Sequence, residues 1–272
     1  MATVFQVLTT LLMVVLFVVF VFKIIIEPVY VLFYNKPVYI HYYFPVRKLD
    51  VVQSDFLERH FSFYKKLSLQ KKKYFNHRVA AFVAKYQFIG QAGFIVTEEV
   101  KLLLAATYVM LTFGMRHYRI NNFNKIIIYA ESYYSVITKQ YHKGEFNPAL
   151  KALVFSWKDF EEGLRCENDN LNLGLHEFSH ALYFHGLKGR DQSSVVFADS
   201  YDKIIAYLKR PDVLNGLIAS NYFRIYAYTN QAEFVAVVLE HFFETPLKFK
   251  QEYPELFTIV AEMINIKEEY FA

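Results

Sequence analysis

The chain has 272 residues, of which 54% are hydrophobic and 19% aromatic, so it is neither a disordered protein nor short of material for a packed core. Its 30 Lys and Arg against 26 Asp and Glu give a formal charge of +4, an excess too small to indicate a nucleic-acid-binding protein. The single cysteine, Cys166, excludes an intramolecular disulfide framework and is compatible with a reducing compartment. The length fits one large domain with an appendage.

The N-terminal segment, residues 3–26, is apolar over about the length that a helix needs to cross a membrane. It has neither the basic start nor the small-residue cleavage site of a signal peptide, so we expect an uncleaved transmembrane anchor over residues 1–28. The alternative, a buried core helix, is disfavoured by so long an apolar run without a polar stripe. Glu27-Pro28 is expected to end the helix, because proline disfavours helical geometry in the residue before it.

Residues 29–52 are predicted to form a linker at the membrane interface. Amphipathic tyrosine rings of the kind that settle there are present at Tyr30, Tyr34, Tyr39, Tyr42 and Tyr43. Nothing before the apolar segment is basic, whereas Lys23, Lys36, Arg47 and Lys48 lie at its end or after it. Because Lys and Arg near a span tend to stay in the cytoplasm, we predict a single-pass membrane protein whose C-terminal domain is cytoplasmic.

The domain is predicted to cover residues 53–272 and to be mainly helical with a small β-sheet, an α+β fold. Apolar residues have helical spacing at 54–64 and 70–85. Thr97, followed by two glutamates, is typical of a helix N-terminus. Two short apolar stretches, at 125–129 and 153–157, predict strands.

The run His176-Glu177-Phe178-Ser179-His180 has the spacing of a zinc-binding helix. Residues four apart lie on one helix face, so His176 and His180 can present two imidazole nitrogens to one Zn²⁺. Glu177, beside the first histidine, can act as the general base that takes a proton from an attacking water. Polar residues at 167–170 are expected to cap this helix, and apolar positions from Leu171 to Leu182 to bury it. The alternative is a surface helix whose histidines only pack or are solvated.

A zinc peptidase needs a third protein ligand and an open fourth position. The metzincin class is excluded, because Tyr183 and Gly186 occupy the positions of its glycine and third histidine. Glu233 is the better candidate, since a carboxylate within an otherwise apolar helix is costly unless it is paired or bound to metal.

We expect the helix that carries Glu233 to be capped by Thr229 or Asn230 and to run through Phe243. Glu240, two turns further, lies on about the same face and is either a partner of a ligand or a solvent-facing glutamate. Accordingly, Glu233→Ala is expected to remove most of the metal and Glu240→Ala little.

Four ordered blocks of the sequence resemble the Mlc titration factor A (MtfA) family of zinc-dependent peptidases, whose active-site arrangement is similar to that of anthrax lethal factor. The blocks are Phe63–Leu67, then Phe155–Trp157 leading into Asn172–His180, then Tyr226–Phe234, and finally Phe242–Pro246 followed by Tyr253–Leu256. The resemblance implies a zincin-like catalytic domain in which His176, His180 and Glu233 are the zinc ligands and Glu177 is the base. It also implies that Tyr226 donates a hydrogen bond to the oxyanion of the tetrahedral intermediate.

Two features depart from that family. Tyr183 stands where an aspartate is often found three residues after the second histidine, and the membrane anchor is absent from the best-known members. Their repressor partner is therefore not transferred, and a regulatory protein partner stays unidentified.

The sequence thus predicts a membrane-anchored zinc metallopeptidase of the gluzincin type, which cleaves peptide or protein substrates by a zinc-activated water. The alternative is a catalytically idle zinc-binding module that captures a regulatory protein at the membrane. Glu177 favours the enzyme, because a pure binder has no need of a base beside the metal.

Overall fold

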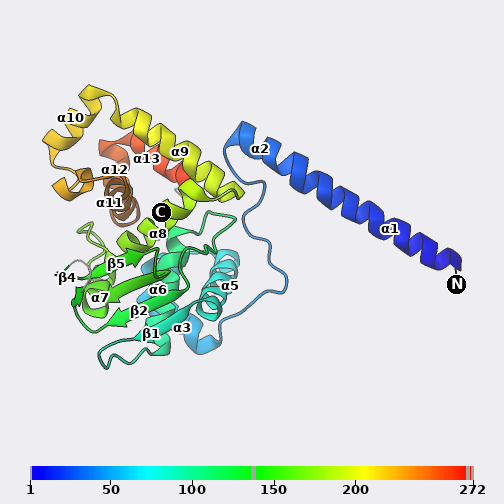
Figure 1. The fold of residues 1–272 in the computed structure, drawn as a ribbon, viewed down its shortest axis with the longest axis horizontal. Coiled ribbons are helices and arrows are strands. Elements are labelled where there is room, and N and C mark those ends of the chain that lie inside the picture. The colour runs from blue at the N-terminus through cyan, green and yellow to red at the C-terminus, as the bar shows by residue number, and fades with distance from the viewer. Residues whose placement is uncertain (1, 136–138, 268–269, 271–272) are drawn as a thin grey trace.

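The computed structural model describes residues 2–135, 139–267 and 270, and it consists of a long N-terminal helix that projects from a mainly helical domain (Figure 1). The predicted C-terminal bound of the domain, Ala272, lies outside the described residues. The domain combines helices with a small mixed sheet, so the predicted α+β fold behind an N-terminal helix is confirmed. The helices of the domain are α3 (Val51–His60), α4 (Ser62–Lys65), α5 (Leu69–Lys85), α6 (Glu98–Leu111), α7 (Trp157–Arg165), α8 (Leu173–Lys188), α9 (Gln192–Leu208), α10 (Pro211–Ser220), the 3₁₀ turn η2 (Ile225–Tyr228), α11 (Gln231–Glu244), α12 (Pro246–Glu252) and α13 (Pro254–Met263).

The N-terminal helix consists of α1 (Ala2–Val21), a π-helical turn η1 (Phe22–Ile26) and α2 (Glu27–Tyr34). It is long and apolar enough to cross a membrane. The prediction that Glu27-Pro28 ends the helix is wrong, and the predicted anchor boundary after residue 28 falls inside it. The π turn lets the amide of Glu27 reach the carbonyl of Phe22, so Pro28 lies in the first turn of α2, where its missing N–H is not needed. Asn35, in the left-handed region, then ends the helix.

The segment that follows, residues 36–50, is irregular but packs on the domain. Arg78 of α5 is fully buried, and its guanidinium donates to the Tyr43 hydroxyl and to three backbone carbonyls of residues 112–115. The Tyr43 ring stacks on His77 at 3.9 Å between centroids, so this tyrosine is not free to lie in a membrane interface. Asp50 and Gln53 form a capping box at the start of α3.

The four-stranded sheet has the order β1-β2-β6-β5 among the described residues. Its strands are β1 (Gln87–Gly90), β2 (Lys125–Tyr129), β6 (Ala152–Ser156) and β5 (Gly144–Asn147); a separate hairpin pairs β3 (Tyr133–Ser135) with β4 (Gln140–His142). The strands β1, β2 and β6 are parallel, and β5 is antiparallel to β6 at the edge. The two predicted strands are thus present, although the second ends at Ser156, which caps the following helix, α7.

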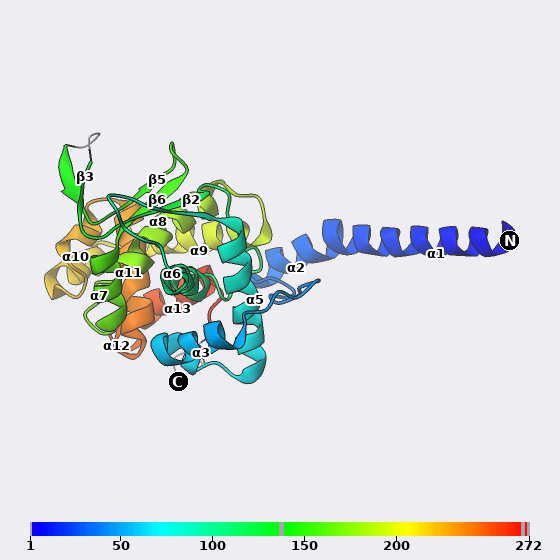
Figure 2. The ribbon, with the colours of Figure 1, turned by 90° about the horizontal axis from the view of Figure 1, so that it is seen from below.

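The core lies between the sheet and the helices α5, α6 and α8. Phe178 of α8 is fully buried and meets the rings of Phe82, Tyr108 and Phe155, one each from α5, α6 and β6. On its other side, α8 packs against α9 and α11 (Figures 1 and 2). The helix with the predicted metal ligands therefore lies at the centre of the domain, between the sheet and the C-terminal helices.

Candidate metal centre

The helix α8 begins later than the sequence predicts. Its N-cap is Asn172, whose side chain accepts a hydrogen bond from the amide of Leu175, and the predicted caps at 167–170 lie before the helix. Leu171 was expected to be buried but is exposed, because it precedes the first turn. The buried residues Phe178, Ala181 and Leu182 face the core, and this leaves His176 and His180 on the opposite face.

His176, His180 and Glu233 come together at one point. The Nε2 atoms of the two histidines are 3.1 Å apart, and Oε2 of Glu233 lies 3.0 Å from Nε2 of His176 and 3.5 Å from Nε2 of His180. Ligands bound to one tetrahedral zinc at its usual bond lengths would be roughly 3.3 Å apart. Oε2 of Glu233 is buried and makes no hydrogen bond to any described residue. A metal ion would satisfy this oxygen and both nitrogens, so the three side chains fit a zinc ligand set.

Glu233 reaches this point from the first turn of α11. Asn230 caps that helix by accepting hydrogen bonds from the amides of Ala232 and Glu233, which settles the choice between the two predicted caps. Burial by itself would raise the pKa of Glu233, but the neighbouring His176 and His180 rings bring it well below its usual value. The carboxylate is therefore ionised and ready to bind a cation.

Glu240 is 1% exposed, so the solvent-facing alternative for this residue is wrong. Its Oε1 lies 2.6 Å from Nδ1 of His176, and Arg224 donates to both carboxylate oxygens at 2.7 and 2.9 Å. Burial acts to raise the pKa of Glu240, but His176 and Arg224 together hold it below its usual value. A carboxylate on the far nitrogen of a ligating histidine fixes the ring orientation and raises its basicity.

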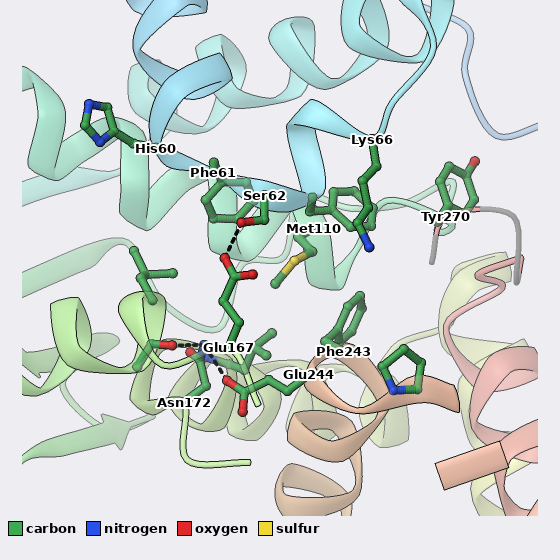
Figure 3. A pocket seen from close by; sticks show the side chains of 15 residues that line it. His60, Phe61, Ser62, Lys66, Met110, Glu167, Asn172, Phe243, Glu244 and Tyr270 are labelled. Carbon is green, nitrogen blue, oxygen red and sulfur yellow. Dashed lines mark hydrogen bonds between the residues drawn. The ribbon is translucent and has the colours of Figure 1, made fainter. Parts of the chain in front are cut away.

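The start of α8 is held by the same group. The backbone amide of Asn172 donates to Oε2 of Glu240, and its side-chain amide donates to the carbonyl of Gly163 and to Glu244. Figure 3 shows Asn172 and Glu244 at one side of a small cavity of about 140 Å³ behind the first turn of α8. Asn172 therefore links α7, α8 and α11 by hydrogen bonds, and these links position His176 relative to Glu233.

Glu177 lines the same cavity as His176 and lies against Gly144 of the edge strand β5. A Cβ atom added to Gly144 would lie 2.7 Å from both Cγ and Oε1 of Glu177 and 2.8 Å from Leu173. Glu177 is 6% exposed, and burial raises its pKa, an effect that the two histidines oppose. A carboxylate with a raised pKa is better suited to take up a proton near neutral pH than an ordinary glutamate.

Gly144→Ala is expected to lower catalytic activity by up to about a hundredfold with the metal content unchanged, because the new methyl group would displace Glu177 by a fraction of an ångström or more. Gly216→Ala in α10 is the matched control, since nothing lies within 4 Å of its added Cβ and alanine favours a helix. The measurement is kcat/KM with metal analysis of both variants. Wild-type activity of Gly144→Ala would contradict this placement of Glu177.

Tyr226 lies on η2 with its ring centroid 6.1 Å from that of His176 and is half exposed. Burial and the Glu233 carboxylate raise the pKa of Tyr226 to about 12, so the phenol keeps its proton at neutral pH. It opens, with His176 and Glu177, onto a cavity of about 550 Å³. The hydroxyl is thus a hydrogen-bond donor at the rim of a space large enough for a substrate segment.

Sequence reasoning did not find Arg224, Gly144 or the role of Asn172. Arg224 precedes Tyr226 by two residues, but nothing in its local pattern indicates that it binds a carboxylate sixteen residues later. Tyr183 contacts neighbouring helices through its hydroxyl, which lies 3.3 Å from that of Tyr201; the Tyr201 hydroxyl in turn donates to Gln231. Tyr183 therefore links α8 to α9 and α11.

Comparison with known proteins identifies the family of this chain. Residues 44–264 match the sequence model of the glucose-regulated metallo-peptidase M90 family, which includes the proteins similar to MtfA. The chain is also 25% identical over 226 residues to a Synechocystis sp. protein described as "Uncharacterized protein slr2042", an alignment that covers 74% of this chain and 78% of that protein. The family match spans most of the chain, and this protein is therefore a member of the M90 metallopeptidase family.

Proposed function

We propose that this protein is a membrane-anchored zinc peptidase in which His176, His180 and Glu233 bind the metal and Glu177 is the general base. The observation that carries the proposal is the meeting of three ligand atoms within 4.8 Å of one another, beside a buried glutamate that is not one of them. Structural zinc sites usually fill all four positions with Cys or His, whereas three ligands from His and Glu leave one position open.

Each residue around the ligands has a separate task. When bound, zinc would polarise the scissile carbonyl and lower the pKa of a water molecule toward neutrality. Glu177 accepts the proton of that water and delivers it to the leaving amine. Tyr226 donates a hydrogen bond to the oxyanion. Glu240 holds the His176 ring in place, and Arg224 balances the charge of Glu240.

The position of the edge strand β5 favours an extended peptide as the substrate. It is the last strand of the described four-stranded sheet, it packs beside α8, and its first residue, Gly144, adjoins Glu177. An extended peptide could therefore pair with β5 by main-chain hydrogen bonds, as in other cases of strand addition, and pass its scissile bond before Glu177. The absence of a side chain at Gly144 leaves room for Glu177 beside the strand.

The test is metal analysis of the purified full-length protein in detergent, together with cleavage of a peptide library. We expect one zinc per chain, because the three ligands make one site, and loss of cleavage when a chelator removes it, with recovery on adding zinc back. Cleavage that persists in zinc-free protein would overturn the proposal.

The anchor is the second part of the proposed function. It rests on the length and apolar character of the helix over Ala2–Tyr34, whose most apolar window has no residue buried in the domain. The excess of basic residues after the span supports a cytoplasmic domain. A reporter fused after Ala272 decides the orientation, and activity of a reporter that works only outside the cytoplasm would reverse it.

A further inference from the structure

The domain contacts the N-terminal helix at a defined position along the axis of that helix. Arg116 forms a buried ion pair with Glu27 of α2, and its guanidinium lies 3.9 Å from the centroid of the Tyr39 ring. The Tyr39 hydroxyl accepts a hydrogen bond from Lys23. These contacts fix Tyr39 beside the π turn that follows α1.

This position, at the π turn, coincides with the expected end of the membrane span. The 20 residues of α1 rise about 30 Å as a helix, which is the thickness of a bilayer hydrocarbon core. Lys23 is the first charged residue after α1, so the headgroup region is expected at Phe22 and Lys23. Tyr39, which contacts both residues, then lies in the headgroup region as well.

The segment beyond Tyr39 exposes apolar side chains on this side of the domain. Both ribbon views show the chain between α2 and α3 extending from the domain toward the same side as α1 (Figures 1 and 2). In this segment, Tyr42 is 76%, Phe44 92% and Val46 54% exposed. Exposed apolar groups so close together are unfavourable in water and typical of a surface that meets a membrane or a partner.

A basic pocket adjoins these side chains. It has a volume of about 440 Å³, and its lining includes Phe44, Arg47, His77, Arg116 and Arg119. Arg47 and Arg119 form no ion pair with any residue that the structure describes, whereas Arg116 is paired with Glu27. Burial, reinforced by Arg78, Arg119 and Arg47, lowers the pKa of His77 to about 4, so the histidine stays neutral within a positive field.

We propose that this pocket binds the phosphate of an anionic phospholipid through Arg47 and Arg119, while Tyr42, Phe44 and Val46 enter the headgroup region of the membrane that holds α1. Guanidinium groups suit this ligand because they bind phosphate oxygens in pairs. The side chains of Tyr42, Phe44 and Val46, which we call the apolar tip, adjoin the charged pocket. A lipid likewise has an acyl boundary next to a charged headgroup, so the tip can meet the first and the pocket the second. The inference rests on the proposed membrane anchor and is independent of the peptidase chemistry.

The first experiment measures the depth of the apolar tip. Full-length Phe44→Trp is placed in nanodiscs whose lipids carry a quencher near the headgroup, and the signal of wild-type Trp157 is subtracted. Tyr134→Trp is the matched control, since Tyr134 is also an exposed aromatic residue but lies on β3, on the opposite side of the domain from α1 (Figure 2). We expect strong quenching at position 44 and little at position 134. Equal quenching at the two positions would overturn the proposal, whereas failure of the anchor itself would appear as protein that does not elute with the nanodiscs.

The second experiment tests the pocket with lipid in mixed micelles of dodecyl maltoside. Each basic residue near a membrane surface contributes about 1 kcal/mol, roughly a fivefold change in binding, so Arg47→Gln with Arg119→Gln should weaken binding of phosphatidylglycerol by roughly twenty-five-fold. Arg165→Gln, at the exposed end of α7, should change nothing. Phosphatidylcholine should bind wild type and double variant alike. Unchanged phosphatidylglycerol binding by the double variant, or its displacement from wild type by an equal concentration of inorganic phosphate, would show that the pocket is not a lipid site.

Discussion

Glu177→Gln is expected to lower the rate of peptide hydrolysis by about a hundredfold to ten-thousandfold while the zinc content stays that of wild type. The amide keeps the size of the carboxylate but cannot accept a proton from the attacking water. Glu177 is not one of the three side chains that converge on the metal position, so its replacement leaves the ligand set intact. Single-turnover rates with metal analysis of the same preparations measure both quantities.

Tyr226→Phe provides the comparison for this variant. Loss of one oxyanion donor costs about a hundredfold to a thousandfold in other enzymes, and the partly exposed Tyr226 is expected to have an effect of that size or smaller, again with zinc retained. If wild type and Glu177→Gln cleave a responsive peptide at equal rates, the proposed mechanism is wrong. If neither cleaves any peptide although both hold zinc, the binding-module alternative is favoured, and capture of cytoplasmic proteins by the zinc-loaded chain becomes the next measurement.

Glu233→Ala is expected to produce the largest loss of metal affinity, because it removes one of three ligands and leaves the two histidine nitrogens 3.1 Å apart without the carboxylate. Loss of a group that only supports a ligand typically costs about tenfold to a hundredfold, and loss of the ligand should exceed this. Competition between the full-length protein and a zinc chelator measures the affinity. Wild-type affinity in Glu233→Ala would remove Glu233 from the ligand set.

Glu240→Gln is the matched variant for this test. The sequence predicts that Glu240→Ala loses little metal, but the structure leads us to expect more, because the Glu240 carboxylate is buried against Nδ1 of His176 and paired with Arg224. We therefore expect the intermediate loss of about tenfold to a hundredfold. Circular dichroism of both variants checks that the domain stays folded.

Local sequence determined the parts of the site that depend on helix geometry. The spacing of His176 and His180 places two imidazoles on one face of any helix, so their convergence follows without knowledge of the rest of the fold. A cap at Thr229 or Asn230 follows from the same kind of local rule, since a short polar side chain before an apolar run satisfies the free amides of the first turn, and the structure selects Asn230. The long apolar N-terminal helix and the strand at 125–129 are likewise recognisable from composition.

Helix ends predicted from the adjacent sequence were wrong where an unusual turn, or a contact with a residue distant in the chain, determined where the helix begins or ends. Proline at position 28 was expected to end a helix, but a π turn ahead of it kept the helix continuous to Tyr34. The start of α8 was predicted too early, because several polar residues precede the true cap, Asn172, whose side chain accepts from the amide of Leu175 and whose backbone amide donates to Glu240.

The sequence by itself determined that the protein has an apolar helix, a mainly helical domain and a zinc-binding pattern within one helix. Only the tertiary structure decided that Glu240 is a buried partner of His176, that Arg224 balances its charge and that Gly144 leaves room for Glu177. The physical reason is that helix periodicity and capping act over a few residues, whereas burial, ion pairing and steric fit depend on groups that folding brings together from separate segments.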